Sequence, residues 1–565
     1  MKGATGPSLQ PLSGWLGVVP AVRTERHFDD RVVRCFAVRP TSTHALLAEA
    51  VATNPDGEAV VCGEERLSYR SFDEIVNGWA AALAELGVAC GDRVALLLGN
   101  GSAFPALLFA VLRLGAIAVP ISIREQAAGL AYMLDHCGAK VLIHDVDLSE
   151  RLPAPSATAR LQHRIALARD TLARDTLARD MMSGMMTGMC GGLHRPGLST
   201  AAPTAAKIDE EDTTIILYTS GTTGRPKGAM LTHLGICHSA MHYQCCMGLT
   251  ARDRSVVAVP MSHVTGVVAL IAAIVRVAGT LIIMREFKAA KFLELAERER
   301  MTHALLVPAM YNLCLLEPRF ERADLSAWRI GGFGGAPMAT ATIERLAEKL
   351  PHLQLMNAYG ATETTSPATL MPTGETARRL DSVGLAVPCG EVLVMDDDGR
   401  EVPSGMEGEL WLRGPMVVRG YWDDPAATAE SFVAGFWRSG DVGSIDREGF
   451  VRVFDRKKDM INRGGYKIYS IEVENTLMAH PDVIEAAVIA RPCPVLGERP
   501  HAVIYRKHDR ATSEELARHC AGLLADYKVP DTFSFRSDPL PRNANGKIMK
   551  RALKDALSSA IDGPS

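Results

Sequence analysis

The chain has 565 residues and a formal net charge of −4, with 47% hydrophobic and 22% charged residues. This composition is ordinary for a globular protein, and the length accommodates about three or four domain-sized units. A charge so near neutral gives no basic surface, so we expect no nucleic-acid partner. Twelve cysteines occur without any C-x-x-C pair, which argues against a zinc ribbon or a thioredoxin-like site.

The apolar segments predict neither a secretory leader nor a transmembrane segment. The run LSGWLGVVPAV near the N-terminus is broken by Gly and Pro, and residues 264–284 carry Arg276 and Gly279 at their middle. In that second segment we expect a buried helix followed by the strand TLIIM. Without a leader, the thiols are expected to be reduced and the protein cytoplasmic. Residues 1–42, rich in Gly, Pro and Arg without a sustained period, predict a loosely ordered extension.

From residue 43 onward, helical and strand patterns alternate. The expected order is helix 44–52, strands 58–63 and 65–69, helix 71–86, strand 93–99, helix 104–114, strand 116–121, helix 125–137 and strand 140–145. This alternation predicts an α/β fold with a parallel sheet and right-handed crossovers. Between residues 153 and 207, tandem LARD repeats and a Met-rich run replace the pattern. They favour a variable surface insertion over a metal or partner site.

A glycine- and hydroxyl-rich loop, YTSGTTGRPKGAM at 218–230, follows the β-branched run TTIILY, which predicts a buried strand. The residues after the loop have helical apolar spacing, with Thr232 as the N-cap. Glycines let backbone N–H groups converge on an anion, while hydroxyls and a lysine add donors and charge. The loop therefore predicts phosphate binding. Pro226 excludes the GxxxxGK[ST] pattern.

The segment TSGTTGRPKG resembles the signature loop of the adenylate-forming superfamily, which contains AMP-forming acyl-CoA synthetases, luciferases and peptide-synthetase adenylation domains. The resemblance covers residues 43–553 apart from 153–207, with five motifs in the family's order. It implies that the loop binds the β- and γ-phosphates of ATP through Thr219, Ser220, Gly221, Thr222, Thr223, Gly224 and Lys227.

Five further segments resemble nucleotide and carboxylate segments of this superfamily. AVPMSHVTG places His263 at the carboxylate site, although a histidine packed in the core would give the same pattern. GGAP implies an adenine loop, and LMNAYGATETT implies adenine, α-phosphate and Mg²⁺ contacts. FWRSGD and the following DRKKD imply ribose contacts. The residues these motifs assign to the nucleotide are Gly334, Gly335, Ala336, Pro337, Asn357, Tyr359, Gly360, Thr362, Glu363, Asp441 and Arg456, with Glu363 as the metal ligand.

The resemblance also implies the domain organisation. A large N-terminal AMP-binding domain, residues 43–457, would combine parallel α/β subdomains with a small β-barrel-like subdomain beginning near Glu391. A small mobile α+β domain, residues 458–565, would follow. Lys458 would be the hinge, and PLPRNANGKIMKR would carry the catalytic lysine, Lys547. His233, Cys237, His242, Cys245 and Cys246 lie close in sequence, but their spacing matches no zinc pattern.

The implied reaction has two steps that use ATP, Mg²⁺ and CoA. A carboxylate attacks the α-phosphate of ATP and releases pyrophosphate, and CoA then displaces AMP from the acyl-adenylate. The candidate lining of the acid pocket contains no Arg that could bind a second carboxylate, and its composition favours a medium- or long-chain fatty acid. The candidate lining residues are Met241, His242, Tyr243, Met310, Gly332 and Ser366. Alternatives are an aryl acid, a carrier-protein acceptor, or a nucleotide-binding protein without catalysis. A homodimer is the candidate assembly.

Overall fold

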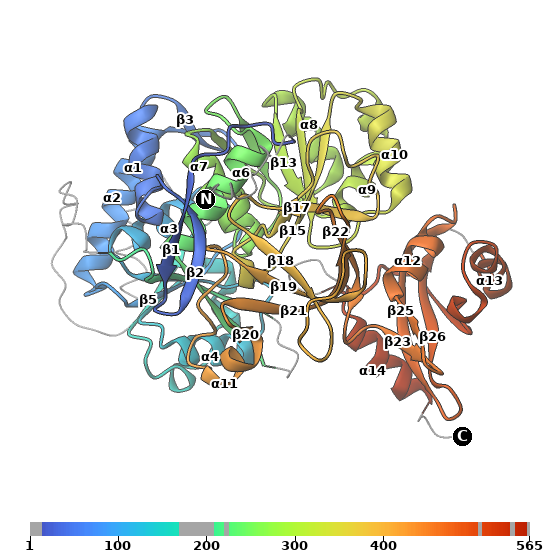
Figure 1. The fold of residues 1–565 in the computed structure, drawn as a ribbon. Helices are drawn as coiled ribbons and strands as arrows, with labels where there is room; N and C mark the ends of the chain where they lie inside the picture. The colour runs from blue at the N-terminus through green and yellow to red at the C-terminus, as the bar shows by residue number, and fades with distance from the viewer. Residues whose placement is uncertain (1–13, 169–207, 220–224, 507–510, 543–547, 562–565) are drawn as a thin grey trace, which may run out of the picture.

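The computed structural model describes residues 14–168, 208–219, 225–506, 511–542 and 548–561 (Figure 1). A large sheet-rich domain is followed by a smaller C-terminal domain, which stands apart at the right of Figure 1 in orange and red. The predicted α/β fold class, with a smaller domain at the C-terminal end, is confirmed. The largest fully buried side chains, among them Trp79 and Trp328, belong to the large domain.

One six-stranded sheet has the order β10-β9-β6-β5-β7-β8. Its strands from β9 to β8 are parallel, whereas β10 returns antiparallel along β9. The strands of this sheet are β5 (Arg93–Leu97), β6 (Ile117–Pro120), β7 (Val141–Asp145), β8 (His163–Leu167), β9 (Thr213–Thr219) and β10 (Lys227–Thr232). The helices of this part of the chain are α1 (Thr43–Thr53), α2 (Tyr69–Glu85), α3 (Ala103–Arg113), α4 (Ala127–Cys137), η1 (Val146–Arg151) and η2 (Pro155–Ala157).

A fourteen-stranded sheet joins a parallel α/β half to an antiparallel half. The parallel half contains β3 (Glu58–Cys62), β11 (Arg254–Val257), β12 (Thr280–Ile283), β13 (His303–Leu306), β14 (Ile330–Gly334) and β15 (Gln354–Tyr359), with β4 (Glu65–Ser68) antiparallel on its edge. Its helices are α6 (His233–Met247), η3 (Thr265–Ala272), α7 (Ala273–Arg276), α8 (Ala289–Arg298), α9 (Pro308–Leu316), η4 (Pro318–Glu321), α10 (Thr340–Lys349) and η5 (Thr362–Thr364). The buried helical stretch before strand TLIIM is thus confirmed, although its first part is a π-helix.

The antiparallel half corresponds to the expected barrel-like subdomain. Its strands are hydrogen-bonded to the parallel half within one continuous sheet and do not form a separate sheet. Its elements are β16 (Thr369–Leu370), β17 (Ser382–Ala386), β18 (Glu391–Met395), β19 (Gly408–Arg413), α11 (Pro425–Ser431), β20 (Phe432–Val433), β21 (Phe436–Ile445) and β22 (Val451–Arg456). The C-terminal domain packs helices against a five-stranded sheet. Its elements are β23 (Ile461–Arg463), β24 (Tyr466–Ile468), α12 (Ser470–Met478), β25 (Val483–Cys493), β26 (Gly497–Arg506), α13 (Ser513–Ala521), η6 (Asp526–Lys528), β27 (Thr532–Arg536) and α14 (Lys550–Ile561).

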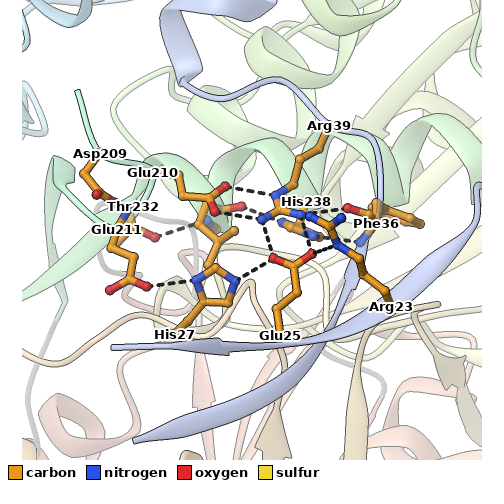
Figure 2. A network of polar contacts seen from close by, with 12 residues as sticks. Arg23, Glu25, His27, Phe36, Arg39, Asp209, Glu210, Glu211, Thr232 and His238 are labelled. Atoms are coloured by element: carbon orange, nitrogen blue, oxygen red, sulfur yellow. Dashed lines mark hydrogen bonds and ion pairs between the residues drawn. The ribbon is translucent and has the colours of Figure 1, made fainter. Parts of the chain in front are cut away.

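The expectation of a loosely ordered extension over residues 1–42 is wrong for the described part of that segment. Strands β1 (Val22–His27) and β2 (Arg31–Phe36) form an antiparallel hairpin, drawn in dark blue across the large domain in Figure 1. The hairpin is tied to residues far along the chain, since Arg39 pairs with Glu25 and with Glu210 at 2.7 Å each. Figure 2 shows this network of ion pairs. A local sequence period could not reveal it.

The boundary of the expected insertion at 153–207 also needs correction. Residues His163–Leu167 form β8, the edge strand beside β7, and Leu167 is buried. The first LARD repeat therefore begins inside the sheet, because Leu167 fills a core position. Residues 169–207, which hold the remaining repeats and the Met-rich run, lie outside the described residues.

Candidate active site

The glycine-rich loop is the connection of a β-hairpin. Thr219 at the end of β9 pairs in register with Lys227 at the start of β10, so these two residues close the neck of the loop. The helix expected directly after the loop starts only at His233, with Thr232 as its N-cap accepting from the Gly235 N–H at 3.1 Å. Met230 and Leu231 belong to β10 instead. The signature residues Ser220, Gly221, Thr222, Thr223 and Gly224 lie outside the described residues.

Strands β14 and β15 bring the expected adenine loop and the YGATE segment to one edge of the sheet. They run parallel with Gly334 opposite Ala358, so residues 335–337 and 360–363 both leave at the carboxyl ends of the strands, where open α/β sheets bind ligands. Gly335 has φ +78° and Gly335, Ala336 and Pro337 are exposed. A Cβ on Gly334 would lie 2.4 Å from the Ala358 carbonyl oxygen, so this close approach requires glycine. Asn357 is half-buried two residues before Tyr359, and Gly360 directly follows Tyr359.

Tyr359, Asp441 and Arg456 form one cluster. The Tyr359 hydroxyl donates to Asp441 Oδ2 at 2.6 Å, and Arg456 Nε lies 2.6 Å from Oδ1 of the same carboxylate. Asp441 faces Arg456 across β21 and β22 and is buried. Burial and the neighbouring Asp441 raise the pKa of Tyr359, and the Asp441 charge raises the pKa of Arg456. The structure thus brings together the two residues expected at the ribose and the tyrosine expected at the adenine.

Glu363 is the centre of a second cluster. Its buried carboxylate accepts a hydrogen bond from the Tyr421 hydroxyl at 3.0 Å and one from Thr219 Oγ1 at 3.5 Å. The Lys227 ammonium lies 5.0 Å from the centroid of the Tyr421 ring, within cation–π range. Burial, reinforced by the Glu363 charge, raises the pKa of Tyr421. Thr362 precedes Glu363 in η5 and is also buried.

Tyr421 is a site residue that the sequence analysis missed. It lies 58 residues after Glu363, in a segment, GPMVVRGYW, that matched none of the motifs. Its position is set by β10, because Ala229 and Tyr421 form an isolated bridge and Trp422 N–H donates to Gly228 O at 2.7 Å. Only this long-range pairing reveals that Tyr421 faces the metal-ligand candidate.

The remaining predicted residues are His263, Lys458 and Lys547. His263 is half-buried, with Nδ1 3.3 Å from Thr265 Oγ1 just before η3. Lys458 is exposed in the turn between β22 and β23. Lys547 lies outside the described residues.

The joint between the domains contains a buried polar network that no motif indicated. Asp455 Oδ2 accepts from the Ser470 backbone N–H at 2.5 Å and from its hydroxyl at 2.6 Å. Lys550, three residues after Lys547, donates to Ser470 Oγ and pairs with Glu474, at 2.6 Å each. Burial raises the pKa of both Asp455 and Glu474. Lys550 is therefore linked through Ser470 to Asp455 in β22, the strand that precedes Lys458.

The ligand atoms that converge among the described residues do not include those of the histidines and cysteines of α6. Among all the residues that the structure describes, three potential metal-ligand atoms converge only at Glu25, His27 and Cys35. Glu25 is already bonded to Arg39, whose hydrogen bond lowers its pKa to about 2, and burial raises the pKa of Cys35 to about 12. A carboxylate held by a guanidinium beside a protonated thiol is a poor cation site.

The residues proposed to line the acid pocket are buried, and they belong to α6, α9, β14 and the segment after Glu363. Tyr243 donates to or accepts from Ser366 Oγ at 2.9 Å, which joins α6 to the segment after Glu363. Met241 and His242 are core residues of α6, and Met310 of α9 and Gly332 of β14 are buried as well. Burial lowers the pKa of His242 well below its ordinary value, so its ring is neutral among these buried side chains.

Comparisons with known proteins agree with this geometry. The sequence profile of the AMP-binding enzyme family matches residues 47–422, and that of the AMP-binding enzyme C-terminal domain matches residues 472–547. The chain therefore belongs to the AMP-binding enzyme family, the adenylate-forming superfamily to which its motifs pointed. Its enzyme class is that of the AMP-forming acid–CoA ligases.

Individual relatives cover nearly the whole chain. A long-chain-fatty-acid–CoA ligase, FadD13 of Mycobacterium tuberculosis, is 32% identical over 521 residues, which is 91% of this chain and 98% of the relative. A feruloyl-CoA synthase of Amycolatopsis is 34% identical over 89% of this chain and 96% of the relative. A solved fatty acyl CoA synthetase of Mycobacterium tuberculosis superposes with a TM-score of 0.71 at 30% identity, covering 92% of this chain and 99% of that structure. In the described part of the chain, no helix is both long and apolar enough to cross a membrane.

Proposed function

We propose that the protein activates a medium- or long-chain fatty acid with ATP and transfers the acyl group to CoA. The observation that carries the proposal is the pair of clusters at one strand edge. The Tyr359–Asp441–Arg456 cluster has the chemistry for a base and a ribose, and the Glu363–Tyr421–Thr219 cluster has the chemistry for phosphate and metal. Both lie where the carboxyl ends of β14 and β15 meet.

Each cluster would perform a separate task in the first step. Asp441 would accept both ribose hydroxyls, with Arg456 fixing the carboxylate. Lys227 and Thr219 at the neck of the loop would hold the departing pyrophosphate, together with the hydroxyls of the loop. Lys547 would stabilise the charge that develops between the attacking carboxylate and the α-phosphate. His263 would form a wall of the carboxylate site.

Glu363 fits the Mg²⁺ that this chemistry requires. Its carboxylate is buried, the Thr219 hydroxyl lies 3.5 Å from Oε1, and the donors are hard oxygens of the kind Mg²⁺ prefers. One carboxylate plus substrate phosphates is the usual set for this ion. When bound, Mg²⁺ would neutralise phosphate charge, while Tyr421 would keep Glu363 oriented.

The nature of the acid follows from the candidate pocket. Buried Met241, Met310 and neutral His242 offer an apolar surface, and none of the six candidate residues is a cation that could bind a second carboxylate. Exchange of labelled pyrophosphate into ATP, measured with a panel of fatty acids from eight to eighteen carbons, tests the proposal. Exchange that depends on acid, followed by thioester formation on adding CoA, is the expected result. Absence of exchange with every acid would contradict it.

The second candidate is an aryl acid, which the likeness to feruloyl-CoA synthase favours. Ferulate and benzoate in the same panel decide between the two. Thioester formation with a carrier protein but not with CoA would indicate the carrier-protein alternative. ATP binding without any exchange would indicate the non-catalytic one. The cytoplasmic location and the homodimer stay predictions, tested by fractionation and by light scattering.

A further inference from the structure

Arg31 is a buried arginine that no motif assigns to any task. It begins β2 of the N-terminal hairpin and is 7% exposed. Its guanidinium is bonded to backbone rather than to a carboxylate: Nη1 donates to Val417 O at 3.2 Å and Val418 O at 2.9 Å, and Nη2 donates to Arg419 O at 3.0 Å. A charged donor shared by three consecutive carbonyls fixes the path of that segment.

The segment fixed by Arg31, residues 417–421, leads directly to the metal-ligand candidate. Val418 N–H donates to the backbone carbonyl of Glu363 at 2.9 Å, and the Tyr421 hydroxyl donates to Glu363 Oε1 at 3.0 Å. One segment thus holds both the backbone and the side chain of Glu363. The carbonyl groups of Val417, Val418 and Arg419 face Arg31, whereas the Val418 N–H and the Tyr421 hydroxyl donate to Glu363.

A ring contact provides a second connection. Phe432 lies under the Arg31 guanidinium at 5.8 Å and packs edge-on against Tyr421, with 5.6 Å between the ring centroids. Phe28, in the turn of the hairpin, lies 5.0 Å from the guanidinium. Arg31 is therefore held between two rings, one of which also contacts Tyr421.

The other anchor of the hairpin is independent of this segment. Arg39 pairs with Glu25 and Glu210, and His27 lies 2.9 Å from Glu211 (Figure 2). These ion pairs attach the hairpin to the residues before β9 and make no contact with residues 417–421. Loss of Arg31 should therefore leave the hairpin docked, and loss of Arg39 should leave the 417–421 segment in place.

We propose that Arg31 is a positioning residue for the metal and phosphate site, acting through residues 417–421 and Tyr421 on the Glu363 carboxylate. The inference rests on the proposed function, in which Glu363 holds Mg²⁺ at the ATP phosphates. Residues that orient a metal ligand typically change metal affinity or activity by about 10- to 100-fold when they are lost. The hairpin that the sequence left unassigned would then be part of the catalytic framework.

The test compares Arg31→Met with the matched variant Arg39→Met in the full chain. Calorimetry measures the affinity for ATP with Mg²⁺ and with EDTA, and pyrophosphate exchange is measured across a Mg²⁺ series. For Arg31→Met we expect MgATP affinity to fall by about 10-fold with little change for metal-free ATP, and half-maximal exchange to need more Mg²⁺. Arg39→Met should lower the melting temperature without changing the Mg²⁺ dependence.

Tyr421→Phe and the double variant that combines it with Arg31→Met measure the coupling between Arg31 and Tyr421. If Arg31 acts through Tyr421, the double variant should be no worse than the worse single one, because contacts in one chain of interactions are not additive. Wild-type Mg²⁺ dependence in Arg31→Met, or an equal change in Arg39→Met, would overturn the inference. If Arg31→Met does not fold, Arg31→Gln is tested in its place, and the same change or lack of change in Mg²⁺ dependence supports or overturns the inference. Failure of wild-type exchange with every acid would refute the proposed function alone, since the calorimetric comparison needs no acid.

Discussion

The hydroxyl of Tyr359 donates a hydrogen bond of 2.6 Å to Oδ2 of Asp441, 82 residues further along the chain. The residue expected to stack on the adenine therefore also orients the carboxylate expected at the ribose. Arg456 holds the other oxygen of that carboxylate at 2.6 Å. With one oxygen fixed on each side, Asp441 is aligned before the nucleotide arrives, which reduces the entropy lost on binding.

Tyr359→Phe tests this alignment, because it keeps the aromatic face and removes only the hydroxyl. We expect KM for ATP to rise roughly tenfold, in line with about 1.5 kcal/mol for a hydrogen bond to a charged group, with a smaller effect on kcat. Steady-state kinetics with ATP varied at saturating acid is the measurement. An unchanged KM would mean that Arg456 alone orients Asp441.

Glu363→Gln should lower the rate chiefly through Mg²⁺ while leaving the fold intact, because the shape is kept and the charge that attracts a hard cation is lost. The expected result is a loss of about 10- to 100-fold at low Mg²⁺ that excess Mg²⁺ partly restores. Exchange rates across a Mg²⁺ series measure this. Glu430→Gln on the exposed surface of α11 is the control and should match wild type. Superimposable Mg²⁺ curves for Glu363→Gln and wild type would refute the assignment.

The sequence predicted the parts of the fold and site whose cause is local. The cap at Thr232, the strand TTIILY and the order of motifs follow from nearby residues, and the structure agrees. Strand β10 was missed because Met230 and Leu231 fit a helical period as well as a strand. The hairpin was missed because its ion pairs, such as Arg39–Glu210, span 171 residues. Tyr421 was missed for the same reason, since its partner Glu363 is remote in sequence.

Glu25→Gln should reveal a pH-dependent contribution to stability from the hairpin. The hydrogen bond from Arg39 lowers the folded-state pKa of Glu25 from its ordinary 4.5 to about 2. Stability from this group is therefore present above pH 4.5 and is lost as pH falls toward 2. The variant should melt at a lower temperature than wild type at pH 7, with the difference shrinking below pH 4.5. Melting curves at pH 7, 5 and 3.5 check this, and a difference that stays constant would contradict it.

Lys547→Ala should nearly abolish adenylate formation but spare thioester formation from synthetic acyl-adenylate. Lys547 lies in the loop that matches the family's catalytic lysine, and its charge is needed only where the carboxylate attacks phosphorus. A loss of about 10²- to 10³-fold is expected for removing one preorganised electrostatic contact. The two half-reactions are measured separately. Equal losses in both would point to a damaged fold rather than to a role in the first step.

The last prediction concerns Lys458 and the movement of the C-terminal domain. In the proposed mechanism, Lys547 would approach the carboxylate for adenylation and then withdraw, because a thiol must reach the same carbonyl carbon. One conformation cannot serve both steps, so a few backbone dihedrals must rotate while the structure on either side is kept. Lys458 suits this task, since it is exposed in the turn between β22 and β23.

The contacts around Lys458 show what such a rotation would have to change. Asp455, on the strand before the turn, is bonded to Ser470, which in turn accepts from Lys550. Rotation about residue 458 would break the Asp455–Ser470 contact. On this prediction, the present arrangement would be one end state, held by the buried Asp455 carboxylate, and the other state would need its own contacts.

Lys458→Pro should trap one of these states. Proline fixes φ near −65°, and none of the described backbone hydrogen bonds uses the Lys458 N–H, so the substitution restricts rotation without removing a bond from this state. We expect adenylation to be spared and thioester formation to fall, measured as pyrophosphate exchange and acyl-CoA production on the same protein. Lys457→Pro is the matched control, because it removes the Lys457 N–H bond to Gly440 O at 2.8 Å and should lower stability instead. If both rates survive in Lys458→Pro, the rotation occurs at another residue.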